Sequence, residues 1–213
     1  MPELALPELN LLNVSLVVAN VVGVAMLFPQ AIRLHRTGQL GGISPHWIGF
    51  GLMMNAGWLV YGLVVDLPGL IPVSAAALAV YVWIYRRAMT LSRSVAVTAA
   101  TTAASLAVGS VVVAVFAGVT VAGIGLGLLY TVQFLPAAIE AVTADDLSGL
   151  APATWGLALL EAVIWTYYGS ATGDLSLLVG GVGAAVMSSI VLVAAVRFGR
   201  TRPMDDRAAP RTV

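Results

Sequence analysis

Two stretches of the chain decide its fold, and the second repeats the first. Residues 28–62 read FPQAIRLHRTGQLGGISPHWIGFGLMMNAGWLVYG, and residues 135–169 read LPAAIEAVTADDLSGLAPATWGLALLEAVIWTYYG. Without any gap, 11 of the 34 positions from 29 to 62 are identical to the residue 107 positions later. The identities include two prolines, a tryptophan and a tyrosine in the same order, which alanine-rich helices do not share by accident. The chain therefore contains one structural unit twice.

The composition places both copies in a membrane. Hydrophobic residues make up 60% of the chain and charged residues 9%, whereas a soluble domain has roughly 45–50% and about 25%. The 46 residues between Arg93 and Glu140 carry no charge. As one helix they would measure about 69 Å, roughly twice the thickness of the hydrocarbon core of a bilayer. We therefore expect two crossings here, with a turn near residues 117–120.

Apolar windows between charges, prolines and glycines predict seven transmembrane helices. They cover residues 12–34, 45–64, 68–86, 94–116, 120–142, 152–171 and 175–197. All ten basic residues are arginines, and they cluster at the ends of the first, third and seventh helices. Seven crossings put these clusters on one side and Glu3, Glu8, Asp66 and Asp174 on the other. The positive-inside rule then places the N-terminus outside and the C-terminus in the cytoplasm.

The repeat and the spans together predict an all-α membrane protein of two parallel three-helix bundles joined by a linker helix (3+1+3). The predicted parts are an extracellular N-terminus (1–11), a first repeat (12–93), the linker helix (94–118), a second repeat (119–198) and a disordered cytoplasmic tail (199–213). Parallel repeats with a substrate site at their interface are a known transporter layout. The N-terminus lacks the pattern of a signal peptide. Basic residues that are all arginine are typical of a GC-rich bacterial genome, which favours the plasma (inner) membrane.

The repeated unit resembles the PQ-loop and SWEET group of membrane proteins. The residues that carry this resemblance are Pro29 and Gln30, the short loop after them, and WLVYG at 58–62. The second copy, with its aromatic pair and Asp174, resembles the second half of SWEET sugar transporters, and the resemblance covers about residues 12–197. It implies alternating-access transport of mono- or disaccharides down their gradient, without cofactor, metal or enzymatic step. The implied partners are a sugar and the lipid bilayer, with no nucleic acid, and a homo-oligomer is left open.

The resemblance also assigns roles to particular residues. The four helix-interrupting prolines of the family match Pro29, Pro45, Pro136 and Pro152, and the tryptophans that stack on the sugar match Trp58 and Trp165. The chain departs from the pattern at the family's asparagines, where it has Ser74 and Gly181 (or Gly180). Ala137 replaces the glutamine of the second PQ pair.

Physical arguments support some of these roles and leave alternatives for others. A proline inside a helix removes one donor and produces a kink, so Pro29 and Pro136 are predicted hinges, whereas Pro45 and Pro152 fit helix starts equally well. Trp58 and Trp165 are predicted to face a cavity, the alternative being a belt at the membrane interface. Tyr61 and Tyr168, with Asp66 and Asp174, are predicted to form an extracellular gate, the alternative being headgroup anchoring.

Glu161 is the one charged residue deep inside a predicted span. It lies four residues before Trp165, so both share one helix face. An ionisable group at that depth is a functional hypothesis by default: it would bind hydroxyls, recognise a cation, take up a proton, or stay neutral and buried. Asn55 is expected at the same level of the other repeat, and the two together would replace the missing asparagines.

These patterns favour a facilitative transporter of small neutral solutes, with sugars as the leading class. The alternatives are a proton-coupled carrier of amino acids or other polar solutes, and a PQ-loop receptor that binds without transport. The chain has no cysteine and no lysine, which excludes thiolate chemistry and a retinal Schiff base. His35 and His46 are expected at the cytoplasmic surface without a third metal ligand, and no catalytic motif fits the predicted spans.

Overall fold

The described part of the chain is entirely helical. The computed structural model describes residues 11–40, 43–143 and 152–198, and within these ranges it contains eight α-helices, one 3-10 turn and no strand. The elements are α1 (Leu11–Ala25), α2 (Phe28–Thr37), α3 (Pro45–Val64), η1 (Pro68–Leu70), α4 (Ile71–Leu91), α5 (Arg93–Ala117), α6 (Val119–Thr143), α7 (Pro152–Thr172) and α8 (Leu175–Phe198). Five helices, namely α3, α4 with η1, α5, α6 and α8, are long and apolar enough to cross a membrane. The prediction of an all-α membrane protein is confirmed at this level.

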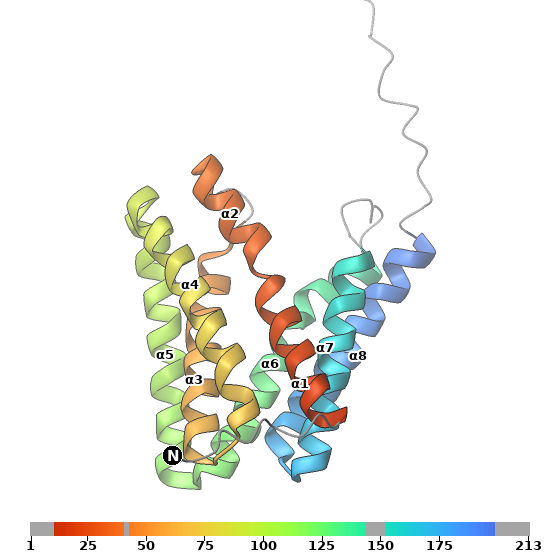
Figure 1. Cartoon of the computed structure of the whole chain (residues 1–213). Coiled ribbons are helices and arrows are strands. Elements are labelled where there is room, and N and C mark those ends of the chain that lie inside the picture. Colours follow the sequence, from red (N-terminus) through yellow and green to blue (C-terminus); the bar gives the residue numbers. More distant parts are fainter. Residues whose placement is uncertain (1–10, 41–42, 144–151, 199–213) are drawn as a thin grey trace, which may run out of the picture.

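The helices form two groups with the same internal order (Figure 1). In the N-terminal group, α4 packs against α1 and α2 on one side and against α3 on the other. In the C-terminal group, α8 packs against both α6 and α7. The groups touch where α1 meets α7 and where α3 meets α6. Since α1 with α2 is equivalent to α6, and α3 to α7, the two contacts are equivalent to each other in the repeat. The remaining helix, α5, packs on α3, α4 and α6.

The turn that follows α3 and the turn that follows α7 have the same backbone geometry. The amide of Leu67 donates to the carbonyl of Gly62 at 2.8 Å, and the amide of Asp174 donates to that of Gly169 at 2.8 Å. Both donors and both acceptors are 107 residues apart. The residue before each donor has a positive φ, 56° at Asp66 and 71° at Gly173. The repeat therefore extends beyond the identical residues into the backbone.

The predicted span at 12–34 is divided into two helices, because the helix breaks in front of Pro29, one of the two predicted hinges. Helix α1 ends at Ala25 and α2 begins at Phe28. Pro29 has no amide hydrogen for the carbonyl of Ala25, and the amide of Leu27 donates instead to the nearer carbonyl of Val24 at 3.1 Å. Helix α2 then runs on to Thr37, where Gly38 (φ 63°) ends it.

The other three prolines do not interrupt a helix. Pro45 and Pro152 are the first residues of α3 and α7, so of the two predicted readings the helix start is the observed one. Ser44 caps α3 by accepting a hydrogen bond from the amide of Trp47 at 3.4 Å. Pro136 lies inside α6, which continues through it.

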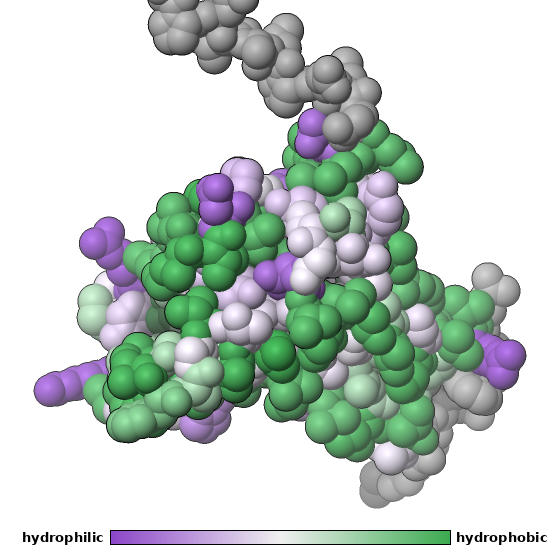
Figure 2. All heavy atoms as spheres, turned by 90° about the horizontal axis from the view of Figure 1, so that it is seen from below, coloured by the Kyte–Doolittle hydropathy of each residue, from purple (hydrophilic) through white to green (hydrophobic). Residues whose placement is uncertain are grey.

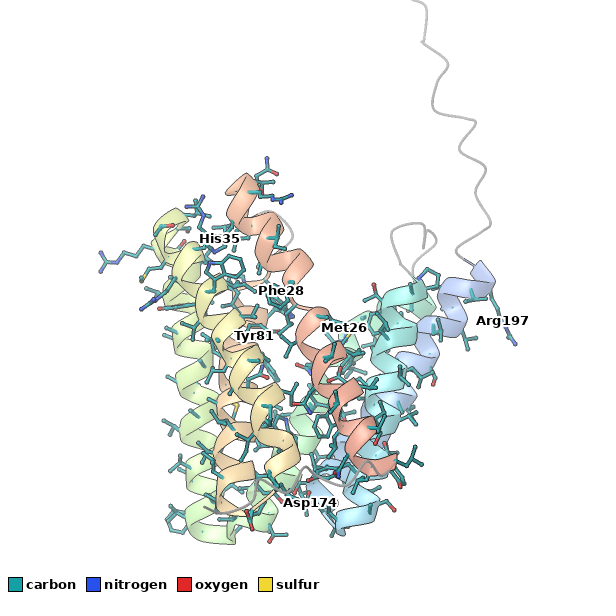
Figure 3. The ribbon with its side chains drawn as sticks, viewed as in Figure 1. Met26, Phe28, His35, Tyr81, Asp174 and Arg197 are labelled. Carbon is teal, nitrogen blue, oxygen red and sulfur yellow. The ribbon has the colours of Figure 1, made fainter. Side chains whose placement is uncertain are left out.

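The two ends of the molecule carry different charges. The described arginines lie on α2, at the end of α4, at the start of α5 and at the end of α8, all at the end where Figure 3 labels His35 and Arg197. We call this the arginine end. Asp174 lies at the opposite end, which we call the Asp174 end. Seen from the Asp174 end, the rim of the molecule is mostly apolar (Figure 2). Helix α5 adds strongly exposed apolar residues, among them Phe116 at 85% exposure, as a lipid-facing helix does.

Among the described residues, the hydrophobic core joins the two groups toward the Asp174 end. One cluster combines residues of both groups, including Tyr61 and Trp58 from α3 with Tyr168 and Trp165 from α7. A second cluster, around Leu34 and Ile84, uses only α2 to α5 and the loop before α3. A third, around Val191, draws on α6 to α8. The groups therefore share their core toward the Asp174 end, whereas toward the arginine end each has its own.

Candidate functional site

A cavity of about 70 Å³ lies between the two groups. Its lining comes from α3, η1, α4, α6, α7 and α8, so both copies of the repeat contribute. The lining residues are Asn55, Trp58, Leu70, Val73, Ser74, Tyr130, Glu161, Trp165, Leu177, Gly180 and Gly181. All six residues that the sequence predicts to bind substrate are among them: Trp58, Trp165, Asn55, Glu161, Ser74 and Gly181. The structure thus brings together side chains that are more than 100 residues apart.

Most of the lining consists of equivalent positions of the repeat. Four pairs are separated by 107 residues: Trp58 and Trp165, Leu70 and Leu177, Val73 and Gly180, Ser74 and Gly181. The three other lining residues, Asn55, Tyr130 and Glu161, have Ala162, Gly23 and Met54 at the equivalent positions. The walls are therefore nearly symmetric, and the polar groups are not.

The two tryptophans face the protein interior. Trp58 is 8% exposed and Trp165 is 6% exposed. Each meets the tyrosine three residues later edge-to-face, with ring centroids 5.7 Å apart for Trp58 and Tyr61 and 6.0 Å apart for Trp165 and Tyr168. Such edge-to-face contacts fix ring orientation. The indoles are thus rigid walls of the cavity and not members of an interfacial belt.

Glu161 is held at the cavity by one hydrogen bond and one glycine. The indole nitrogen of Trp165 donates to Oε1 of Glu161 at 3.2 Å. Helix α1 passes the carboxylate at Gly23, where a β-carbon would overlap with Oε1. The nearest other atom to that position belongs to Val73 of α4. A side chain at position 23 would therefore have to displace the Glu161 carboxylate, which projects from the other group.

Two other predicted binding residues are engaged in contacts within or between helices. The side-chain amide of Asn55 donates to the carbonyl of Gly51 at 2.8 Å, which leaves its oxygen for the cavity. At Gly181 a β-carbon would lie 2.6 Å from the backbone nitrogen of Thr166 in α7. Gly181 therefore serves the close packing of α8 on α7, and it offers the cavity only backbone.

The tyrosines of the predicted gate reach across the interface at the Asp174 end. The Tyr61 hydroxyl donates to Oδ2 of Asp174 at 2.7 Å, and the Ser176 hydroxyl lies 2.9 Å from it. The Tyr168 hydroxyl lies against Gly69, where a β-carbon would be 3.0 Å from its oxygen. Gly69 and Ser176 are equivalent positions of the repeat, so each tyrosine contacts the same point of the opposite group. We call these two contacts the tyrosine latch.

Asp66, the other aspartate of the predicted gate, does not take part in the latch. It is exposed, and its equivalent in the repeat is Gly173. The position equivalent to Asp174 is occupied by Leu67, which is buried in the shared core. Asp174 also caps α8, since its Oδ1 accepts from the amide of Leu177 at 2.8 Å. The two aspartates are one position out of register.

Sequence reasoning missed several residues of the site. Leu70, Leu177 and Val73 could have been found by carrying the 107-residue spacing into η1, α4 and α8. Tyr130 and Gly23 are equivalent positions of the repeat, 107 residues apart. They differ in residue type, so no sequence identity marks them. The histidines lie apart from the site: His35 stacks on Trp83 at 4.1 Å, and Nδ1 of His46 lies 2.8 Å from the Thr102 hydroxyl.

No protein-family model matches the chain, and no curated protein matches it significantly. The geometry of the cavity and of the latch therefore carries the functional argument.

Proposed function

We propose that the protein is a facilitative, alternating-access transporter of small neutral solutes, with sugars as the leading class, similar to SWEET transporters. In this proposal α1 with α2 forms the first of seven spans, and α5 links two parallel three-helix bundles. The shared helix order of the two groups and the equivalent contacts at their interface support it. The single observation that carries it is a cavity between two copies of one unit, walled by one tryptophan from each.

Alternating access requires that the cavity be closed on one side at a time. The tyrosine latch and the shared core close it at the Asp174 end. Toward the arginine end each group has a separate core. Under the positive-inside rule the arginine end is cytoplasmic, so in this proposal the described conformation is closed to the outside and would open on the inside, where each group has its own core.

The lining suits a small polyhydroxylated solute. An indole offers a flat apolar face and one donor, and each group contributes one indole to the cavity lining. Asn55, Ser74 and Tyr130 add uncharged polar groups. The cavity is several-fold smaller than the roughly 300–1,000 Å³ of typical drug-sized pockets. Monosaccharides therefore fit this conformation better than disaccharides.

Counterflow of labelled monosaccharide in proteoliposomes tests the proposal. We expect wild type to exchange internal for external sugar, and Trp58→Ala and Trp165→Ala to lose most of that exchange. Trp83→Ala is the matched control, because Trp83 is 37% exposed and lies outside the cavity. Equal exchange in all four proteins would show that the cavity is not part of the transport path. Binding without exchange would identify a receptor instead.

The position of Glu161 favours one second candidate, a proton-coupled carrier of amino acids or other polar solutes. A carboxylate at the cavity is the group through which a proton would be coupled to a solute. The two candidates differ in one measurement, since only the coupled carrier accumulates solute when an inward proton gradient is imposed.

A further inference from the structure

The cavity contains a carboxylate for which the described part of the chain supplies no cation. The other ten lining residues are uncharged. The chain has no lysine, and the described arginines belong to the arginine end. His35 and His46 are engaged with Trp83 and Thr102. Any positive charge that compensates Glu161 must therefore come from outside the described protein.

The carboxylate is only half satisfied. Oε1 accepts the indole hydrogen of Trp165 at 3.2 Å. Oε2 accepts no hydrogen bond from the described residues. It is also not one of the fully buried polar atoms that lack a partner, so it is accessible from the cavity. Because residue 23 is a glycine, α1 passes the carboxylate of Glu161 without displacing it. The fold thus makes room for a carboxylate and leaves one of its oxygens for a ligand.

The positive charge that compensates Glu161 could be a proton or a cationic solute, and the surroundings of Glu161 distinguish between the two. A charge in a low-dielectric site is costly unless it is paired, and either a proton or a cationic solute would compensate it. The cavity also presents the rings of Trp58, Trp165 and Tyr130. Aromatic faces attract an ammonium group, whereas a proton bound to Glu161 makes no interaction with them. The combination of one carboxylate and three aromatic rings favours an ammonium ion.

We propose that the preferred solute is a small polyhydroxylated primary amine, such as an amino sugar, whose ammonium group pairs with Glu161 while its body lies between Trp58 and Trp165. This inference rests on the proposed transport function and narrows its substrate class. Because Met54 stands at the position equivalent to Glu161, only one group offers a carboxylate. The solute is therefore bound in a single orientation, with its amine toward α7.

Glucose and glucosamine are the matched probes, because they differ only in the group at one ring carbon. We expect wild type in proteoliposomes to bind and exchange glucosamine with a Kd about 10- to 100-fold below that of glucose, the range for a hydrogen bond to a charged partner. N-acetylglucosamine, which has the same nitrogen without the charge, should bind like glucose. Glu161→Gln keeps an acceptor for Trp165 and should abolish the preference, so that glucosamine and glucose bind with similar Kd.

Glu140→Gln is the control for the loss of one carboxylate. Glu140 lies ten residues beyond Tyr130 on α6, about 15 Å along the helix, and the preference for glucosamine should survive the change. The wild-type comparison of the three sugars requires no variant, so a poorly folded Glu161→Gln protein does not block the test.

Two outcomes overturn the inference: the first leaves the facilitative transporter proposal intact, and the second replaces it with the proton-coupled carrier. The first is equal binding of the three sugars by wild type. The second is glucose uptake that an inward proton gradient drives in wild type and not in Glu161→Gln, since the carboxylate then serves a proton. The other residues that face Glu161 are Gly23 of α1, Val73 and Ser74 of α4 and Tyr130 of α6, of which only Tyr130 is ionisable. Failure of every sugar to bind or move in any variant overturns both proposals.

Discussion

The segment ahead of the loop in the N-terminal group is two helices, α1 and α2, whereas its counterpart in the C-terminal group, α6, is one helix that continues through Pro136. Both segments carry a proline at the same position of the repeat. What differs is the packing just before the proline. At Gly127 a β-carbon would collide with the Ser176 carbonyl of α8, and one at Gly183 would overlap with Thr131 of α6. Close packing on α8 holds α6 in one piece.

The N-terminal group lacks these close contacts. Asn20 stands at the position of Gly127, and Ala76 at that of Gly183. Asn20 instead joins α1 to η1, because its amide donates to the carbonyl of Gly69 at 3.1 Å. Helix α1 therefore packs less tightly on α4, and the missing hydrogen bond at Pro29 is resolved by a break. A proline thus permits a break, and the neighbouring helix decides whether the break occurs.

The largest effect should follow from filling the glycine contact of the C-terminal group. Gly127→Leu places a side chain where the Ser176 carbonyl and Gly180 now lie, and overpacking of this kind costs about 1–3 kcal/mol or more. We expect loss of the monodisperse protein in detergent, measured by size-exclusion chromatography and thermal unfolding.

Two control changes locate that effect. Gly125→Leu, on the same helix, should be tolerated because nothing lies within 4 Å of a β-carbon there. Asn20→Leu, at the equivalent position of the other group, should cost only about 0.5–1.5 kcal/mol for its hydrogen bond to Gly69. Equal losses in both groups would contradict the difference in packing.

The two halves of the tyrosine latch should differ in strength. Tyr61 donates to a carboxylate, whereas Tyr168 packs against Gly69, and a hydrogen bond to a charged group is worth about 1.5–3 kcal/mol. Tyr61→Phe should therefore open the Asp174 end more than Tyr168→Phe does.

A single cysteine reports on that opening, because the chain has none of its own. Leu177→Cys lines the cavity next to the latch, and its rate of labelling by a membrane-impermeant maleimide added at the Asp174 end should rise in the order wild type, Tyr168→Phe, Tyr61→Phe. Tyr167→Phe is the control, since Tyr167 is 44% exposed and outside the latch. The reverse order would show that the Asp174 contact does not hold the gate.

The comparison of the groups also shows which features sequence could predict. The helices and the two cavity tryptophans were predictable, because apolar length and a 107-residue spacing are properties of the chain itself. The contact of Gly23 with Glu161 was not, because it joins helices of different groups and leaves no local pattern. The two aspartates of the predicted gate are a further example. They stand one position apart in the repeat, since Asp66 is equivalent to Gly173 and Asp174 to Leu67, and Asp174 is the one that contacts Tyr61.

The smallest effect concerns the two prolines themselves. Pro29→Ala restores a donor for the carbonyl of Ala25, a hydrogen bond worth about 0.5–1.5 kcal/mol, and should let α1 and α2 join. Spin labels at Val17 and Arg36, both exposed, would then approach the spacing of a straight helix, about 28 Å for 19 residues, in double electron–electron resonance. Labels at Leu128 and Val142 of α6 should stay within about 2 Å of the straight-helix spacing in both wild type and Pro136→Ala, because α6 is already continuous. If the α1–α2 distance does not change in Pro29→Ala, then contacts with α4 and α7, and not the absent amide, impose the break, and the difference between the groups lies wholly in their packing.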